Sequence, residues 1–220
     1  MNNYQKQLNQ INHLNHRPTL LLHICCGVCS VYPLIYLRQY FKITILFTNS
    51  NIYPYEEFLK RLDALNQYLE YLGDKEIKLI VNKYDYDKYR QILEPFKDEP
   101  EMGKRCKICY GLRMEEGFKY ADKFHYEYFT TVMSISNRKN AEYINEIGET
   151  LEKKYPSVKY LHADFKKGDG INKNEALNKE LHLYHQNYCG CEFSIRDCPK
   201  TNLWLDSLLL FVYFFINFVR

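Results

Sequence analysis

Short apolar runs and longer mixed segments alternate along the chain. Continuous apolar or β-branched runs of strand length occur five times, at Thr19–Cys25, Lys42–Phe47, Glu76–Val81, Glu127–Met133 and Val158–Ala163. The segments between and after them predict helices at Val31–Tyr40, Tyr55–Leu72, Asp87–Leu93, Cys106–Tyr120, Ala141–Lys154 and Glu175–Tyr184. The polar stretches Lys97–Lys104 and Lys166–Asn174 contain glycine and predict loops. Strands that alternate with helices predict an α/β fold, with a mainly parallel sheet and helices on both faces.

The size and composition are those of one globular domain. The 220 residues, 46% hydrophobic and 26% charged, suit a single domain, which we place at residues 1–200, followed by an apolar tail at 201–220. Within the tail, Leu203–Val219 is interrupted by three polar residues, and its longest clean run has nine residues, whereas a spanning helix needs about 20. We expect a docked helix or a membrane-surface anchor there, and no stable membrane insertion. The net charge of +3 neither indicates nor forbids a nucleic-acid partner.

The eight cysteines are the unusual feature of the composition. Met1–Thr19 is polar, without the apolar core of a secretory signal, so we expect a cytoplasmic protein in which disulfides are disfavoured. Seven cysteines fall in three tight motifs: Cys25-Cys26-x-x-Cys29, Cys106-x-x-Cys109 and Cys189-x-Cys191. Clustered cysteines in such a protein indicate metal or redox chemistry. Cys198 stands apart, and we interpret it as a free or core cysteine.

The first motif follows the first predicted strand and begins a helix. In open α/β sheets, ligands bind at the carboxyl ends of the strands, and a helix N-terminus favours thiolates. We therefore expect metal centres at this edge of the sheet. Four thiolates complete one iron–sulfur cluster or one zinc site, and three remain for a second metal with an open position.

Two structural zinc sites are the alternative explanation of the cysteines. The motifs are separated by 76 and 79 residues, which favours iron–sulfur chemistry over a local zinc ribbon with its roughly 12–20-residue loops. The chain has neither a phosphate-binding P-loop nor a dinucleotide-binding glycine motif, which argues against nucleotide hydrolysis. We interpret His23 as a core histidine and the many tyrosines as packing residues rather than base-stacking ones. Four basic residues between Lys104 and Arg113 have no acidic neighbour, and can offset cluster charge or hold phosphate.

The motifs in order resemble the cobalamin-independent epoxyqueuosine reductase family. The matching stretches are LHICCGVCS at 22–30, FTNSNIYP at 47–54, RCKICYGLR at 105–113, FTT at 129–131 with Ile135-Ser136 and Lys139-Asn140, DFKK at 164–167 with Gly170, and YHQNYCGC at 184–191. The resemblance extends from about Leu20 to Cys198. The family often has Ala-Pro in place of Gly27-Val28, Pro in place of Asn137 and Arg in place of His185. No metal ligand is lost, but with His185 in place of Arg a phosphate contact at that position is not expected from the resemblance.

The resemblance implies a Rossmann-like fold related to adenine-nucleotide α-hydrolases. It implies reductive removal of the epoxide oxygen of epoxyqueuosine at the wobble position of tRNA, giving queuosine. The implied cofactors are a [4Fe–4S] cluster and an adjacent single iron, without cobalamin, and the electron donor is unknown. The ligands carried over are Cys25, Cys29, Cys106 and Cys109 for the cluster, and Cys26, Cys189 and Cys191 for the iron.

The resemblance also yields candidate residues around the metals. Tyr188, Asp164 and Lys166 are the candidate proton donors. The candidate substrate or tRNA contacts are Asn49, Asn51, Tyr110, Arg113, Arg138, Lys139 and Lys167. Two other functions stay open: an iron–sulfur tRNA sulfur-transfer enzyme, for which no adenylation loop is found, and a zinc-stabilised RNA-binding module without catalytic activity.

Overall fold

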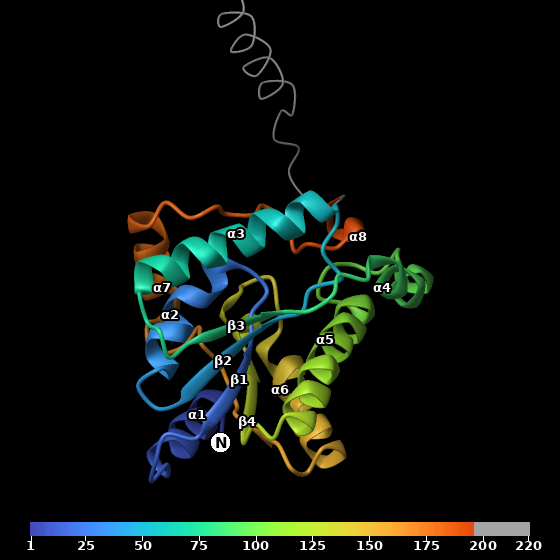
Figure 1. Cartoon of the computed structure of the whole chain (residues 1–220). Helices are drawn as coiled ribbons and strands as arrows, with labels where there is room; N and C mark the ends of the chain where they lie inside the picture. Colours follow the sequence, from blue (N-terminus) through green and yellow to red (C-terminus); the bar gives the residue numbers. More distant parts are fainter. Residues whose placement is uncertain (196–220) are drawn as a thin grey trace, which may run out of the picture.

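A five-stranded sheet forms the centre of the molecule (Figure 1). The computed structural model describes residues 1–195. The strands are β1 Thr19–His23, β2 Lys42–Phe47, β3 Lys78–Val81, β4 Tyr128–Thr131 and β5 Lys159–Tyr160. Their order is β3-β2-β1-β4-β5, and every neighbouring pair is parallel. The α/β fold with a parallel sheet is therefore confirmed, and its layers are Rossmann-like.

The strand order reverses beside β1. The chain proceeds from β1 through β2 to β3, and then crosses back to place β4 on the other side of β1. Leu20 pairs with Ile43 on one side and with Tyr128 on the other. Such a reversal opens a crevice at the carboxyl ends of the two diverging strands. The loop that leaves β1 carries the first cysteine motif into this crevice.

Helices cover the two faces of the sheet. α2 (Gly27–Leu37) packs against α3 (Tyr55–Leu72) and α7 (Gly170–Glu180), whereas α5 (Lys104–Lys123) packs against α6 (Ala141–Lys154) on the opposite side (Figure 1). Leu20, Leu21 and Leu22 have no exposed surface, because both faces of β1 are covered. α4 (Tyr86–Leu93) and the short α8 (Glu192–Ile195) complete the helical layers beside the carboxyl edge.

Three predicted elements have the expected boundaries, and several others differ from the prediction at one or both ends. The boundaries of β2, α3 and α6 are those predicted. β1 ends at His23 rather than Cys25, because Cys26 already serves as the extended N-cap of α2, which begins at Gly27 instead of Val31. β4 ends at Thr131, where the Thr131 hydroxyl accepts from Met133 N and a 3-10 turn covers Val132–Ile135. β3 begins two residues late, and α5 is longer at both ends.

The last strand and the last long helix differ most from the prediction. β5 was expected over Val158–Ala163 but spans Lys159–Tyr160, because Gln10 and Asn145 accept hydrogen bonds from the backbone of His162 and Ala163. α7 begins at Gly170, within the predicted loop, and ends at Glu180 rather than Tyr184. Gly170 permits this early start, because a Cβ there would lie 1.9 Å from Phe165 O.

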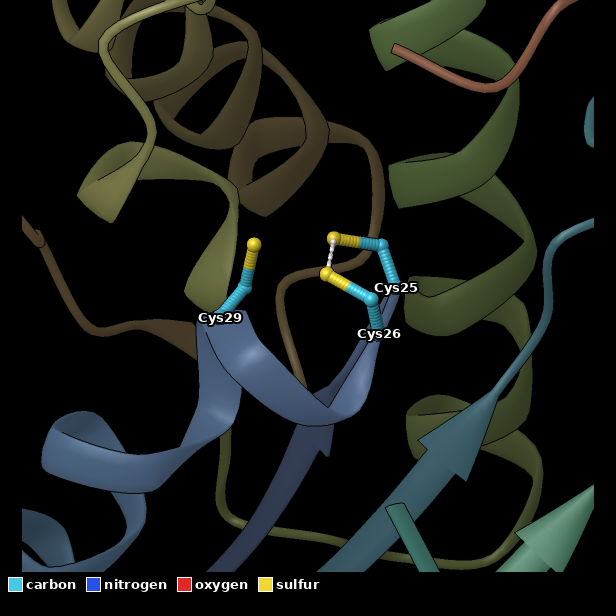
Figure 2. A group of neighbouring side chains, drawn as sticks. All are labelled: Cys25, Cys26 and Cys29. Atoms are coloured by element: carbon cyan, nitrogen blue, oxygen red, sulfur yellow. Dashed lines mark hydrogen bonds between the residues drawn. The ribbon is translucent and has the colours of Figure 1, made fainter. Parts of the chain in front are cut away.

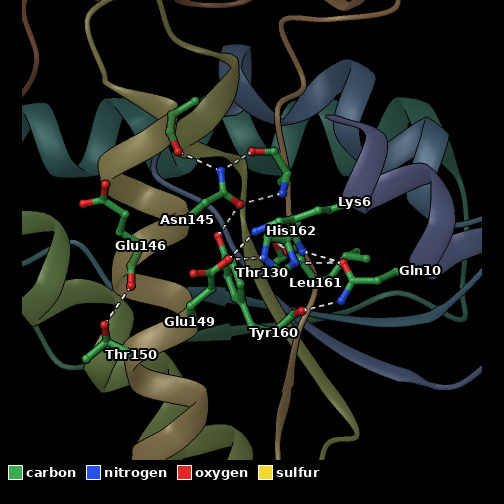
Figure 3. A network of polar contacts seen from close by, with 12 residues as sticks. Lys6, Gln10, Thr130, Asn145, Glu146, Glu149, Thr150, Tyr160, Leu161 and His162 are labelled. Carbon is green, nitrogen blue, oxygen red and sulfur yellow. Dashed lines mark hydrogen bonds and ion pairs between the residues drawn. The ribbon is translucent and has the colours of Figure 1, made fainter. Parts of the chain in front are cut away.

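Helix α1 (Asn3–Asn12) was not predicted, because its sequence is polar. It is held by a network of hydrogen bonds rather than by a wide apolar stripe (Figure 3). Gln10 donates to Tyr160 O at 2.8 Å, and Lys6 pairs with Glu149 at 2.6 Å. Glu149 also contacts His162 Nε2 at 2.8 Å, so α1, β5 and α6 are joined at this edge of the sheet.

The predicted apolar tail at 201–220 lies outside the described residues. Within residues 1–195, no helix is both long enough and apolar enough to cross a membrane.

Candidate metal centre and substrate pocket

The first cysteine motif brings three sulfur atoms together at the end of β1 (Figure 2). Cys25 and Cys26 lie in the connection to α2, and Cys29 lies in the first turn of that helix. Their Sγ atoms all lie within 4.8 Å of one another, and those of Cys25 and Cys26 are 3.7 Å apart. In the described part of the chain, this is the one group of three or more such side chains with that spacing.

The spacing of this first thiol group suits a single metal ion. A tetrahedral ion bound to thiolates at about 2.3 Å requires sulfur atoms about 3.8 Å apart, close to the observed Cys25–Cys26 distance. The group can therefore bind a metal with three ligands and leave one position open. All three side chains are buried, which excludes competing water from most directions.

Electrostatics within the first group favour one thiolate over three. Sulfur contacts with Cys26 and Cys29, together with the cations of Lys139 and Arg113, lower the pKa of Cys25 well below its ordinary value. Burial and the neighbouring Cys25 raise the pKa of Cys26 to about 12. Gln186 Nε2 donates to Cys26 Sγ at 3.2 Å, which helps to fix the position of this sulfur.

The second and third motifs form a separate thiol group. Cys106 and Cys109 lie on α5, and Cys189 and Cys191 lie in the loop before α8. Burial raises the pKa of Cys106 to about 11 and of Cys109 to about 12, and repulsion from Cys189 and Cys191 adds to both shifts. Within residues 1–195, no three of these four sulfurs approach as closely as those of the first group. The mutual repulsion places these four thiols near one another, so together they can offer four thiolates to a metal centre.

Two buried cations lie beside these thiols. Arg113 is 2% exposed and donates to Asn49 Oδ1 at 2.6 Å and to His23 Nε2 at 3.4 Å. Burial opposes its charge, but the neighbouring Cys109 and Cys25 raise its pKa. Lys139 is 6% exposed, and Cys189, Cys25 and Cys29 raise its pKa against the same opposition from burial. These cations can offset the negative charge that deprotonated cysteines accumulate.

His23 is a core histidine, as expected from its strand. It has no exposed surface, and its Nδ1 shares a 2.7 Å hydrogen bond with Thr131 Oγ1. Burial and the adjacent Arg113 lower its pKa to about 3, so it is neutral at physiological pH.

A pocket of about 790 Å³ lies against thiols of both groups. Cys29 and Cys189 contribute to its wall, as do Lys139, Gln186 and Tyr188. The remaining wall comes from α7, from the segment 135–138, and from Val28, His182, Leu183 and His185. The volume is that of a site for a small molecule or a single nucleotide.

The three candidate proton donors occupy different places. Tyr188 lines the pocket, and its hydroxyl donates to Tyr53 O. Lys166 donates to Ser134 O at 2.7 Å and to Lys139 O at 3.3 Å, and so braces the segment that ends in Lys139. Asp164 is half-buried and, like Lys166, does not line the pocket. Their roles in proton transfer stay predictions.

The candidate tRNA contacts separate into buried and accessible residues. Asn49, Asn51, Tyr110 and Arg113 are at most 2% exposed. Asn49 uses both ends of its amide internally, because it accepts from Arg113 and donates to Ile24 O at 2.8 Å. Two roles were expected for Arg113: to offset the charge of the metal centre or to hold phosphate. Its burial beside the thiols favours the first role. Arg138 and Lys167 are exposed, and Arg138 pairs with Glu101 at 3.2 Å. Contact with RNA stays a prediction for all of them.

Sequence reasoning missed Arg61 and Gln186. Arg61 is 2% exposed, pairs with Glu57 at 2.7 Å, and donates to Cys189 O at 2.9 Å and Tyr188 O at 3.1 Å. It therefore holds the third cysteine motif in place. Its position three residues after Phe58 and four before Leu65 puts a charge on the apolar stripe of α3, and this signal is visible in the sequence. The signal for Gln186 is its place in the YHQNYCGC stretch at 184–191, which carries the family resemblance.

Comparison with known proteins identifies the family of the chain. The family model described as epoxyqueuosine reductase QueH matches residues 20–197. An epoxyqueuosine reductase QueH of Staphylococcus aureus is 38% identical over 183 residues, covering 81% of this chain and 76% of the relative. The Staphylococcus epidermidis protein of that name is 36% identical over 201 residues, covering 87% and 84%. That of Streptococcus pyogenes is 34% identical over 183 residues, covering 82% and 71%. The chain therefore belongs to the epoxyqueuosine reductase QueH family, whose members are oxidoreductases.

Proposed function

We propose that this chain reduces epoxyqueuosine in tRNA, removing the epoxide oxygen as water and leaving queuosine. The observation that supports this most is the shared pocket. Cys29 from the first thiol group and Cys189 from the second both lie in its wall. A substrate in this pocket contacts both groups at once, as a reaction that combines oxygen binding with electron delivery requires.

We further propose how the seven thiols divide between two metal centres. The closely spaced Cys25, Cys26 and Cys29 suit a single iron, and the looser set of Cys106, Cys109, Cys189 and Cys191 suits a [4Fe–4S] cluster. The count of four and three is that expected from the sequence. The resemblance divides the thiols differently, with Cys25 and Cys29 on the cluster and Cys26 on the iron. The approach of all three sulfurs to within 4.8 Å of one another is what supports the division proposed here. When bound, the iron supplies a Lewis acid and the cluster supplies single electrons, so cobalamin is not required.

The chain's own residues complete the site. The ammonium of Lys139 lies in the pocket wall beside cysteines of both groups, and we propose that it hydrogen-bonds to the substrate oxygen as negative charge develops there. Lys166 holds the Lys139 segment through its bonds to Ser134 O and Lys139 O. Of the three candidate proton donors, Tyr188 lines the pocket, whereas Asp164 and Lys166 do not.

The tRNA contacts follow from exposure. We propose that Arg138 and Lys167, both exposed, contact phosphates near the pocket and make the affinity salt-dependent. The wobble nucleotide lies in a single-stranded loop, so it can enter the pocket without the opening of a duplex. A tRNA substrate also supports the cytoplasm as the location, and we propose residues 1–200 as the single domain that carries the activity.

The experiment that tests this function uses the whole chain. Reconstituted under anaerobic conditions with iron and sulfide, and supplied with dithionite, it should convert epoxyqueuosine to queuosine in tRNA from a strain that accumulates the epoxide. Mass spectrometry of the nucleosides measures the conversion. Unchanged epoxyqueuosine in the presence of an intact cluster would contradict the proposal. Zinc in place of iron and sulfide would favour the RNA-binding module.

A further inference from the structure

Four tyrosines, two exposed and two half-buried, form an aromatic surface at the carboxyl edge of the sheet, which we call the tyrosine platform: Tyr53, Tyr55, Tyr84 and Tyr86. The rings of Tyr53 and Tyr86 have centroids 5.1 Å apart, and those of Tyr55 and Tyr84 are 4.9 Å apart. The ring planes of Tyr84 and Tyr86 are nearly parallel, at 9°, and their centroids are 6.4 Å apart. Tyr53 and Tyr55 are 40% and 47% exposed, although large aromatic rings are usually covered. The platform lines a cavity of about 450 Å³.

The platform is held rigidly from below. The hydroxyl of Tyr84 donates to Ile52 O at 2.6 Å, and Asp85 N donates to Ser50 Oγ at 2.9 Å. Phe58 packs beneath Tyr55 and Tyr84, with ring centroids 5.7 and 4.9 Å away. Because the rings are already ordered, a planar ligand that stacks on them costs little further side-chain entropy.

The platform adjoins the wall of the substrate pocket. Tyr53 N donates to Gly190 O at 2.8 Å, and Gly190 lies between Cys189 and Cys191. Tyr188, which lines the substrate pocket, donates its hydroxyl to Tyr53 O. The segment 188–190 therefore joins the two places: Tyr188 and Cys189 line the substrate pocket, and Tyr188 and Gly190 are hydrogen-bonded to Tyr53 of the platform.

The chemistry of the platform suits a nucleobase better than a phosphate. Its cavity includes Lys83 but also the carboxylates of Asp85 and Asp87, which repel phosphate and can accept from amino groups of a base. Ring faces that stack with bases are how proteins hold unpaired nucleotides without reading their sequence.

We propose that the tyrosine platform is a second nucleotide site, which stacks the base of an unpaired loop nucleotide next to the one in the substrate pocket. This inference rests on the proposed function, because it takes the occupant from the same tRNA loop. It also revises the interpretation of the tyrosines as packing residues alone, for these four side chains.

The test measures RNA binding rather than turnover. The probe is a synthetic RNA hairpin with the anticodon-arm sequence of a substrate tRNA and a fluorescent purine analogue beside the wobble position. With the full-length metal-loaded protein, Tyr55→Ala should weaken hairpin binding about 5- to 100-fold and remove the fluorescence quenching caused by stacking. Tyr55→Phe, which keeps the ring, should bind within about twofold of wild type.

The matched control lies on the same helix. Tyr71 is 59% exposed in the last turn of α3, about 24 Å along the helix from Tyr55, and Tyr71→Ala should bind the hairpin as wild type does. Unchanged thermal unfolding and visible absorbance establish that Tyr55→Ala is folded and loaded.

The outcomes separate this inference from the proposed function. A Tyr55→Ala variant that binds and quenches the hairpin like wild type overturns the nucleotide site, even if the wild type converts epoxyqueuosine. A second outcome also overturns the nucleotide site: Tyr55→Ala binds the hairpin normally, but loses activity when a protein reductant replaces dithionite. That outcome assigns the surface to an electron donor. Hairpin binding through Tyr55 by a protein that never converts the tRNA supports the nucleotide site and contradicts the reductase function alone.

Discussion

Replacing Asn49 with leucine should destabilise the protein more than any change of similar size at the surface. Asn49 is 1% exposed, and its amide joins two elements of the site. It donates to Ile24 O, directly before Cys25, and accepts from the buried guanidinium of Arg113. Leucine is of similar size but removes both hydrogen bonds and leaves a buried cation with fewer partners.

The magnitude follows from the two bonds. A neutral hydrogen bond contributes about 1 kcal/mol and a bond to a charged group about 1.5–3 kcal/mol, so Asn49→Leu should cost about 3 kcal/mol of unfolding free energy. For a domain of this size, 1 kcal/mol shifts the Tm by about 2–4 °C, which gives a fall of about 6–12 °C.

Thermal and urea unfolding of the reduced, metal-free protein, followed by circular dichroism, measures this loss without contribution from metal binding. Asn66→Leu is the matched control, because Asn66 is exposed on α3, and it should change the free energy by no more than about 0.5 kcal/mol. A loss below about 1 kcal/mol for Asn49→Leu would refute the view that Asn49 and Arg113 fix the loop before Cys25.

Three further predictions test the packing, the pH dependence and the pocket. Gly148→Ala should destabilise by about 1–3 kcal/mol, because its Cβ would lie 2.3 Å from the Tyr160 ring. Gly111→Ala, with open space around it on α5, should stabilise by up to about 1 kcal/mol, and equal urea midpoints for the two variants would contradict this reasoning. Lys6 and His162 lower the pKa of Glu149, so the stability that this carboxylate contributes is complete above the unfolded carboxyl pKa and is lost as the pH falls through the folded value. Lowering the pH from 5 to 3 should therefore reduce the free energy of urea unfolding more for wild type than for Lys6→Met. Equal pH dependence of the two free energies would exclude the linkage. Lys139→Met should lower kcat about 10- to 100-fold with little change in KM, whereas Lys167→Met should raise KM alone, as steady-state kinetics with purified tRNA would show. A Lys139→Met enzyme with wild-type kcat would remove Lys139 from the reaction.

The fold could be predicted where apolar periodicity is strong. β2 and α3 have the predicted boundaries, because a continuous β-branched run and a regular apolar stripe determine them locally. β5 could not be predicted correctly, because Gln10, 152 residues away from His162, accepts the backbone bond that a longer strand would have used. Helix α1 is anchored by polar side chains, and its sequence therefore has no apolar signal.

The site shows the same division between local and long-range information. The sequence indicated that three cysteine motifs meet at the carboxyl edge, because successive parallel strands end there. The division of the thiols came only from the family resemblance and stays a prediction. The spacing of the residues could not supply it, since the 3.7 Å separation of the Cys25 and Cys26 sulfurs depends on the backbone turn into α2. The tyrosine platform depends on α3 and the segment after β3 lying side by side, which no single stretch of sequence encodes.

The division of the thiols between two centres is tested most directly by the visible absorbance of two variants, purified and reconstituted anaerobically. Cys26→Ala removes a ligand from the first group, and should keep the cluster absorbance while losing conversion of epoxyqueuosine tRNA. Cys191→Ala removes a ligand from the second group, and should lose both the absorbance and the conversion. Retention of the cluster absorbance in both variants would contradict the division proposed here and would favour a single iron held by Cys26, Cys189 and Cys191.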